Sequence, residues 1–234
     1  MISIICPTYN CCENIGTLIN SVFSQTFQDY ELIVVDGAST DGTLDILRKQ
    51  SARLRYISEP DNGIYDAMNK GIDIAKGEWL YFIGADDTLY SDNVIEQITP
   101  LLHEDTDVLM CDIMSPKLGR CSSTFSLKTY FTNTIHHQGV IYNRRVLETY
   151  RYDTTLRIVA DYDMNLYIWK KRFNIEYSNI ILANHAPEGV SGQPHFINYK
   201  EEITVRNRYI KSKPLQWLLA IVSYTKFILK NLKN

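Results

Sequence analysis

The sequence lacks the features that mark several classes of protein. No apolar run reaches the roughly 18–20 residues of a membrane-spanning helix, so we expect no spanning segment. The five cysteines have neither a disulfide framework nor the spacing of a zinc site, which predicts reduced thiols in a cytosolic protein. A net charge of −3 provides no basic field for nucleic acid. The chain opens directly on a strand pattern, and we expect no signal peptide.

The composition is that of a globular protein with a substantial core. The 234 residues are 45% hydrophobic and 22% charged. Short strand patterns alternate with helical patterns in the first half of the chain. This alternation predicts an α/β fold with a doubly wound, mostly parallel sheet and right-handed crossovers. The predicted strands cover residues 2–6, 30–35, 54–57, 79–83 and 108–113.

The alternation stops after about residue 112. Strand patterns over 119–127 and 139–143 have no clean helix between them, a helix is predicted over 161–171, and a Gly/Pro-rich loop of the kind that closes over ligands covers 184–194. We therefore expect one main domain over residues 1–200, with a regular half (1–112) and an irregular half (113–200), followed by a tail (201–234).

The tail has a composition of its own. It contains no acidic residue from Ile203 onward, and a helical pattern over 214–229 places Gln216, Ser223 and Lys226 on one narrow stripe beside a broad apolar face that includes Trp217. A basic helix of this kind is typical of one lying in the membrane interface. Anionic lipid would add about 1 kcal/mol of attraction per basic residue near the surface. The alternative is a helix that docks on its own core or on a second copy of the chain.

The stretch over residues 76–87 organises the rest of the chain. An apolar strand from Trp79 to Ile83, bounded by glycine, ends in the adjacent carboxylates Asp86 and Asp87. In open α/β sheets, ligands lie beyond the carboxyl ends of the strands. Two carboxylates at that place suit a hard divalent cation, which in turn binds phosphate oxygens. Alternatively, the two residues only lead a turn into the next helix, as aspartate often does.

Two other predicted strands end in polar residues at the same edge of the sheet. The first is followed by Pro7-Thr8-Tyr9-Asn10 and the second by Asp36, so both can converge with Asp86 on one ligand. The three motifs, Ile-Ile-Cys-Pro-Thr-Tyr-Asn, Val-Val-Asp-Gly-Ala-Ser-Thr-Asp-Gly-Thr and Ala-Lys-Gly-Glu-Trp-Leu-Tyr-Phe-Ile-Gly-Ala-Asp-Asp, occur in the order and spacing of a known family. From Ile2 to about Ser191 the sequence resembles the family 2 glycosyltransferases, inverting enzymes of the GT-A fold, and most of all the small bacterial members that build surface polysaccharide.

The resemblance implies a site for a nucleotide-sugar donor and a divalent metal, Mg²⁺ or Mn²⁺. Pro7, Thr8 and Tyr9 would flank the base, and Asp36 would accept a ring N–H, which uracil and guanine both offer. Asp86 would coordinate the metal, with Asp87 binding it directly or supporting it from behind. The implied nucleotide-sugar residues are Pro7, Thr8, Tyr9, Asn10, Asp36, Asp61, Asn69, Lys70 and Asp86, and the implied metal ligands are Asp86, Asp87 and His185. For Asp61 a plain turn is the alternative, and for His185 a solvent-facing loop position.

The resemblance also implies a catalytic base. Inversion at the sugar carbon needs a base that deprotonates the acceptor hydroxyl on the face opposite the leaving diphosphate. In the family this is the aspartate of a Glu-Asp-x-Asp motif at the start of a helix, and here Asp161 aligns with it. Asp161 is also a candidate for the N-cap of that helix. Asp163 would be an acceptor-site or structural partner, and His137 with Gln138 would form the floor of the sugar and acceptor site or a buried hydrogen-bonded pair.

Three positions depart from the family's pattern. Gly84 stands at the first position of the usual Asp-x-Asp, Met68 stands where many relatives carry arginine, and Ala160 replaces the usual glutamate before the base. These departures keep open a non-catalytic alternative, in which the chain binds nucleotide sugar or assembles a membrane complex. A nucleotidyltransferase would want a Gly-rich, basic loop after the first strand, which this sequence lacks.

The sequence therefore predicts an inverting, metal-dependent hexosyl- or deoxyhexosyltransferase. The resemblance implies a UDP- or GDP-sugar donor and a saccharide acceptor in bacterial surface polysaccharide biosynthesis. Since the tail resembles an interfacial helix, we expect a lipid-linked acceptor and a cytoplasmic protein peripheral to the inner face of the plasma membrane. Nucleic acid is not an expected partner.

Overall fold

The computed structural model of the chain describes residues 1–50, 52–186 and 196–231. The Gly/Pro-rich loop predicted over 184–194 lies outside the described residues after Ala186. Among the described residues, no helix is long and apolar enough to cross a membrane.

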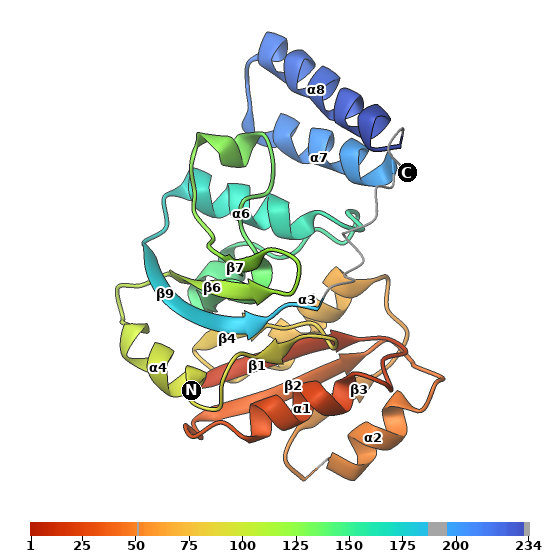
Figure 1. Ribbon diagram of the computed structural model, residues 1–234, viewed down its shortest axis with the longest axis vertical. Coiled ribbons are helices and arrows are strands. Elements are labelled where there is room, and N and C mark those ends of the chain that lie inside the picture. The colour runs from red at the N-terminus through yellow and green to blue at the C-terminus, as the bar shows by residue number, and fades with distance from the viewer. Residues whose placement is uncertain (51, 187–195, 232–234) are drawn as a thin grey trace.

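A twisted sheet of nine strands runs through the molecule in the order β3-β2-β1-β4-β8-β6-β9-β5, with β7 paired to β6 off this path (Figure 1). The strands are β1 (Ile2–Thr8), β2 (Tyr30–Asp36), β3 (Arg55–Ser58), β4 (Trp79–Phe82), β5 (Thr88–Leu89), β6 (Val108–Ser115), β7 (Gly119–Cys121), β8 (Val140–Asn143) and β9 (Ile175–Asn184). The first four strands in this order are all parallel, as predicted. The strand predicted over 119–127 is confined to β7, the short return strand of a hairpin.

The second half of the sheet is mixed because β8 is inserted between β4 and β6. It runs antiparallel to both of these neighbours, whereas β6 and β9 are parallel. The insertion attaches the irregular half of the chain directly to the edge of the regular half. One continuous sheet therefore carries residues from both halves.

Helices cover both faces of the sheet. They are α1 (Ile15–Phe23), α2 (Thr43–Gln50), α3 (Ile64–Ile74), α4 (Val94–Ile98), α5 (Arg144–Thr149), α6 (Ala160–Lys171), α7 (Phe196–Tyr209) and α8 (Lys213–Asn231). Successive residues of β1 point into two different cores: Ile4 packs with α1, and Ile5 packs with α3 and α6. Since side chains alternate across a strand, this is the arrangement of a doubly wound sheet. The prediction of that fold class is confirmed.

Helix α3 approaches the sheet closely along the small face that Ala67, Gly71 and Ala75 form. A Cβ atom added at Gly71 would lie only 2.4 Å from Cγ2 of the buried Ile5 on β1. Such a contact requires a shift in one of the two elements, because interiors are packed to crystal-like density.

We expect the substitution Gly71→Ala to lower the free energy of unfolding by about 1–3 kcal/mol, which is the usual effect of overpacking. For a chain of this size the melting temperature would fall by about 2–4 °C per kcal/mol, as differential scanning calorimetry can measure. Gly16→Ala on α1 is the matched control, because a Cβ atom there meets nothing within 4 Å. The control should be neutral or slightly stabilising. A Gly71→Ala protein as stable as the Gly16→Ala protein would contradict the close packing of α3.

The last two helices extend the fold beyond the sheet. In Figure 1, α6, α7 and α8 are stacked on one another, with α8 outermost. Residue 200, where the tail was expected to follow the main domain, lies inside α7. The guanidinium of Arg206 on α7 is buried and donates to the Ser223 hydroxyl on α8 and to the Phe131 carbonyl. Helix α8 is fastened to α7 through this hydrogen bond and through contacts of the Phe227 ring with Phe196 and Tyr199.

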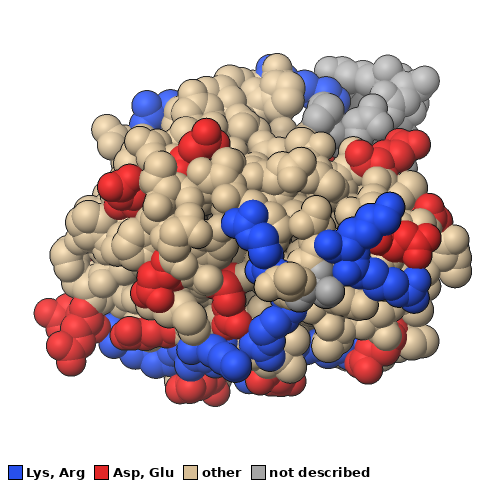
Figure 2. Space-filling model, turned by 90° about the horizontal axis from the view of Figure 1, so that it is seen from below, with Lys and Arg blue, Asp and Glu red and all other residues tan. Residues whose placement is uncertain are grey.

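Leu219 of α8 is buried, but most of the apolar face of this helix is turned outward. Trp217 is 73% exposed, and Leu218, Ile221 and Ile228 are exposed as well. Lys226 of this helix is also exposed. At the opposite end of the molecule, acidic and basic side chains are interspersed over the face shown in Figure 2.

Candidate active site

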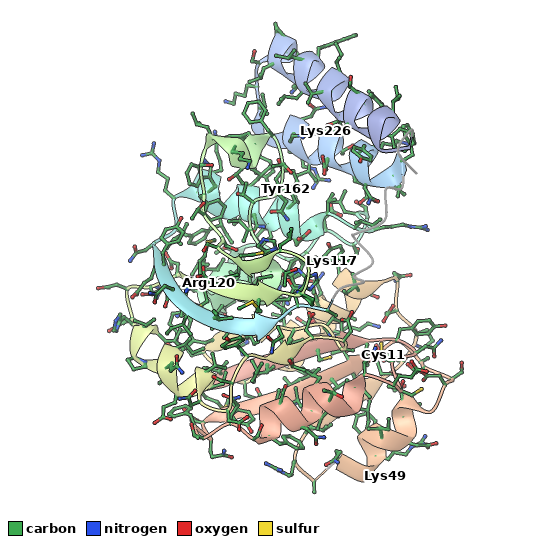
Figure 3. All side chains as sticks on the ribbon, in the orientation of Figure 1. Cys11, Lys49, Lys117, Arg120, Tyr162 and Lys226 are labelled. Atoms are coloured by element: carbon green, nitrogen blue, oxygen red, sulfur yellow. The ribbon has the colours of Figure 1, made fainter. Side chains whose placement is uncertain are left out.

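The carboxyl ends of β1, β2 and β4 meet at one edge of the sheet. The parallel register pairs Thr8 with Asp36 and Ile5 with Phe82, so the residues that follow these strands are neighbours in space. Cys11, a few residues beyond the end of β1, marks this edge in Figure 3. The predicted convergence of the three strand ends is therefore present.

A cavity of about 370 Å³ opens beside the end of β4. This volume is within the usual range of about 300–1,000 Å³ for ligand pockets. Its walls come from both halves of the chain and include six of the predicted site residues. They are Ile64, Tyr65, Met68, Gly84, Asp86, Asp87, His137, Gln138, Tyr152, Arg157, Ile158, Asp161 and His185.

Asp86 presents an open carboxylate to this cavity. It is exposed, and among the described residues its carboxylate meets only its own backbone N–H as a donor. Partial burial and the neighbouring charge of Asp87 raise the pKa of Asp86 above its ordinary value. A cation bound beside Asp86 would stabilise its charged form and so oppose both causes of the raised pKa.

Asp87, in contrast, is buried and fully engaged. Its Oδ1 accepts from the Ala186 N–H at 2.8 Å and contacts His185 Nδ1 at 3.2 Å, and its Oδ2 accepts from Gln138 at 3.2 Å and from the Gly84 N–H at 3.3 Å. Burial opposes the ionisation of Asp87, but the hydrogen bonds from His185 and Ala186 outweigh it, so its pKa lies below the ordinary value. The partnership with Asp87 also raises the pKa of His185.

The predicted set of three metal ligands is therefore not assembled. No group of three or more His, Cys, Asp or Glu side chains able to hold a metal ion occurs in the part of the chain that the structure describes. The physical reason is that Asp87 and His185 bond to each other and to Gln138. Asp86 alone remains open, with Asp87 behind it.

Asp161 lies in the first turn of α6 and lines the same cavity. It is the second residue of that helix, and Val159 occupies the N-cap position, so the alternative that Asp161 is the N-cap is wrong. Its Oδ1 lies 3.1 Å from the Tyr65 hydroxyl, and its Oδ2 accepts from the Asn133 amide at 3.1 Å. Burial and the charge of Asp161 raise the pKa of Tyr65 well above its usual range, so the phenol keeps its proton.

Sequence reasoning missed both partners of Asp161. Asn133 belongs to the irregular half, and its Oδ1 in turn accepts from the Asn165 amide at 3.1 Å. Tyr65 is the second residue of α3 and lies on the buried, apolar face of that helix. Its hydroxyl needs a hydrogen-bond partner there, and this was the only signal in the sequence that could have pointed to it. Neither residue is close to Asp161 in sequence, so only the folded chain brings the three together.

The structure places Asp163 away from the cavity. Two residues along a helix point to nearly opposite sides, and the buried Asp163 carboxylate accepts from the Tyr150 hydroxyl just after α5 and, at 2.9 Å, from Arg208 on α7. Its expected place in the acceptor site is therefore wrong, and the structural alternative holds.

Asn69 and Lys70 do not line the cavity either. The Asn69 amide bonds to both backbone groups of Tyr152, and the Lys70 ammonium pairs with Glu59 at 2.8 Å, which raises its pKa. Their predicted contact with the nucleotide sugar has no support in this arrangement, because their polar atoms are already paired within the protein.

Comparison with known proteins identifies the family. The family model described as glycosyl transferase family 2 matches residues 3–136, which is more than half of the chain. The chain belongs to glycosyl transferase family 2. It is 34% identical over 195 residues to the PGL/p-HBAD biosynthesis glycosyltransferase of Mycobacterium tuberculosis, covering 79% of this chain and 76% of that protein.

Solved structures of low sequence identity share the fold. S. aureus TarS has a TM-score of 0.68 at 20% identity over 93% of this chain, which spans only 42% of the TarS chain. The mannosyltransferase PcManGT of Pyrobaculum calidifontis, solved with GDP-Man and Mn²⁺, has a TM-score of 0.67 at 18% identity, over 95% of this chain and 69% of its own. The sheet described above is therefore the GT-A fold, and the protein is a glycosyltransferase.

Gly84 marks where this glycosyltransferase departs from the family's usual Asp-x-Asp. A Cβ atom at Gly84 would lie 2.8 Å from Asp86 Oδ1 and 2.8 Å from Asp87 Oδ2. A side chain at position 84 would displace one of these carboxylates. Glycine at this position therefore lets both carboxylates keep the positions that they have here.

Some of the residues predicted to bind the nucleobase are exposed, and others are buried and hydrogen-bonded within the protein. Tyr9 is 61% exposed. Its ring and the Asp61 carboxylate both lie close to Gly37, because a Cβ atom added at Gly37 would be 3.4 Å from the Tyr9 ring and 2.7 Å from Asp61 Oδ2. Asp61 also accepts from the Gly63 N–H at 2.9 Å, as expected of the turn alternative.

Asp36 is the residue of this group whose carboxylate is already bonded within the protein. It is fully buried, and its oxygens accept from the Ser39 N–H and hydroxyl and from the Ser58 hydroxyl. The direct contact between Asp36 and a base therefore requires the Ser39 hydroxyl to move aside. Asn10 holds the same turn from the other side, since its Oδ1 accepts from the Thr40 N–H at 2.9 Å. Pro7 and Thr8 are buried at the end of β1.

Proposed function

We propose that this glycosyltransferase inverts the anomeric centre of a sugar that it takes from a UDP- or GDP-sugar, with the help of Mn²⁺ or Mg²⁺. One observation carries the proposal: the same cavity is lined by the open carboxylate of Asp86 at the end of β4 and by the hydrogen-bonded carboxylate of Asp161 at the start of α6. A single displacement needs these two elements, a place for the leaving diphosphate and a base for the incoming hydroxyl.

The metal-binding part of the proposal assigns one protein ligand, Asp86. Mg²⁺ in phosphate-transfer sites is commonly held by one or two carboxylates together with substrate phosphates and water, so a full cage of protein ligands is not required. The ion would neutralise charge on the departing diphosphate. Asp87 would act from behind Asp86, because its own oxygens are bonded to the protein.

Asp161 accepts the proton of the acceptor hydroxyl in this proposal. Tyr65 and Asn133 hold one carboxylate oxygen each, which fixes the direction of the remaining lone pairs. His137 and Gln138 line the cavity, and the proposal places the donor sugar against them. At the other end, the exposed ring of Tyr9 offers a stacking face for the base, with Asp61 close by and Asp36 behind the turn.

A thermal-shift series with UDP, GDP and dTDP, each with and without Mn²⁺, tests this function. A ligand at about 100 times its dissociation constant adds about 2.7 kcal/mol to stability. For a chain of this size we expect the melting temperature to rise by about 5–10 °C with one nucleotide, and only when Mn²⁺ is present. The matching nucleoside monophosphate is the control, and it should give a smaller, metal-independent shift. Equal shifts with and without Mn²⁺ would contradict the assignment of Asp86.

We further propose that the acceptor is a lipid-linked saccharide and that α8 lies on the inner, cytoplasmic face of an anionic membrane. The exposed apolar residues of α8 include Trp217, an amphipathic side chain suited to the interface, and the exposed Lys211, Lys213 and Lys226 complement anionic lipid. The exposed residues of α8 thus combine apolar and basic side chains, and Lys211 lies just before this helix.

Deleting α8 would be an ambiguous test, because Ser223 accepts a hydrogen bond from the buried Arg206. We instead expect the double variant Trp217→Gln/Ile221→Gln to lose binding to phosphatidylglycerol vesicles in a sedimentation assay while keeping its melting temperature. Leu118→Gln, at another exposed apolar residue, is the control. Unchanged sedimentation of the double variant would rule out the membrane role. Dissociation of a dimer by the same variant would instead favour docking on a second copy.

A further inference from the structure

A second, smaller cavity adjoins the one described above. Its volume is about 260 Å³. It is lined by Asn62, Gly63, Ile64, Tyr65, Thr154, Leu156 and Arg157. Ile64, Tyr65 and Arg157 line both cavities and so form their common wall.

The smaller cavity lies on the acceptor side of the site. The shared residue Tyr65 contacts Asp161, the proposed base. The residues assigned to the metal and the donor sugar, Asp86, His137 and Gln138, line only the larger cavity. A saccharide whose reacting hydroxyl is at Asp161 can therefore extend past Tyr65 into the smaller cavity without entering the donor site.

Arg157 gives this extension its chemical character. Among the described residues that line the smaller cavity, it is the only charged one. Its side chain is exposed, and within the described ranges its guanidinium forms neither an ion pair nor a hydrogen bond. Two arginines nearby do have carboxylate partners: Arg151 pairs with Asp73 at 3.0 Å, and Arg208 pairs with Asp153 at 2.7 Å.

The backbone of Arg157 is held firmly. The buried Glu201 of α7 accepts from the Arg157 N–H at 2.9 Å and from the Ile158 N–H at 3.0 Å. The Ile158 carbonyl in turn lies 2.7 Å from the Tyr65 hydroxyl. The guanidinium thus projects from a segment whose position is fixed relative to the proposed base, while its own donors are unused. An unused guanidinium fork suits a planar or tetrahedral oxyanion.

We propose that the smaller cavity is an acceptor subsite in which Arg157 binds an anionic group, a carboxylate or a phosphate, on the part of the acceptor next to the reacting sugar. This inference rests on the proposed function for its placement beside Asp161. The two sources of the anion are an acidic sugar and the phosphate that links a sugar to a lipid. Both present oxygens that accept two parallel N–H bonds from arginine.

Isothermal titration of the full chain with three probes tests the proposal. The probes are methyl β-D-glucuronide, methyl β-D-glucoside, which carries a neutral hydroxymethyl group in place of the carboxylate, and α-D-glucose 1-phosphate. Each is titrated into the chain alone and in the presence of UDP or GDP with Mn²⁺. We expect at least one anionic probe to bind about 10-fold or more tightly than the neutral glucoside, and Arg157→Gln to remove that preference. Arg151→Gln, in the same segment but outside both cavities, should retain it.

The two anionic probes separate the sources. Preference for the glucuronide indicates an acidic sugar, and preference for the phosphate indicates a phosphate-linked acceptor. Equal binding of all three probes, binding of none, or an anion preference that survives Arg157→Gln would overturn the proposal. The thermal shift with nucleotide and Mn²⁺, measured on the same preparation, shows separately whether the donor site assigned above is at fault.

Discussion

Asp161→Asn is expected to lower kcat for sugar transfer by about 10²–10⁴-fold, the usual contribution of a general base. The amide has the shape of the carboxylate but cannot take a proton from the acceptor hydroxyl. The nucleotide-dependent thermal shift should be unchanged, since Asp161 lies on the acceptor side of the cavity. Initial rates with a radiolabelled donor sugar, together with the thermal shift, measure the two effects.

Asp73→Asn is the matched control for this variant. Asp73 is on α3, pairs with Arg151 at 3.0 Å, and does not line the cavity, so the control should keep the full rate. A normal rate in Asp161→Asn would remove the base from the proposal. An inactive wild-type chain that still binds nucleotide with Mn²⁺ would favour the non-catalytic alternative, for which the Gly84, Met68 and Ala160 departures argue.

Asp86→Asn is expected to abolish the Mn²⁺-dependent part of the thermal shift and to reduce kcat/KM by about 10²-fold. That factor corresponds to about 3 kcal/mol, at the lower end of what a metal contributes at a developing charge. The substitution removes the only open carboxylate at the end of β4 but leaves the Asp87 network intact. Asp45→Asn, at an exposed carboxylate on α2 that pairs with Arg48, is the control. Retention of the Mn²⁺ effect in Asp86→Asn would show that another residue holds the ion.

The sequence predicted the regular half of the fold well because its signals are local. The strands β1, β2 and β4 are short apolar runs that end in turn residues, and β1 and β2 are each followed by a helix. In the second half the decisive contacts are between distant segments, so local periodicity was a poor guide. The antiparallel insertion of β8 between β4 and β6 joins residues at least 30 positions apart, and no pattern within these strands indicates it.

The candidate site shows the same division. Motif spacing identified Asp86 and Asp161, and both line the cavity. Motif spacing also assigned Asn69, Lys70 and Asp163 to the site, although each of these side chains is paired within the protein. Whether a polar side chain is free depends on which distant groups reach it, and a linear motif carries no information about those groups.

By itself, the sequence determined the family, the sheet edge at which ligand-binding residues gather, and the amphipathic character of the last helix. Only the tertiary structure decided that Asp87 is bonded to His185 and Gln138 while Asp86 is open, that Tyr65 and Asn133 hold Asp161, and that α8 turns its apolar side outward. The physical reason is that strand ends and helix faces follow from neighbouring residues, whereas the partner of a buried charge is set by packing between segments far apart in the chain.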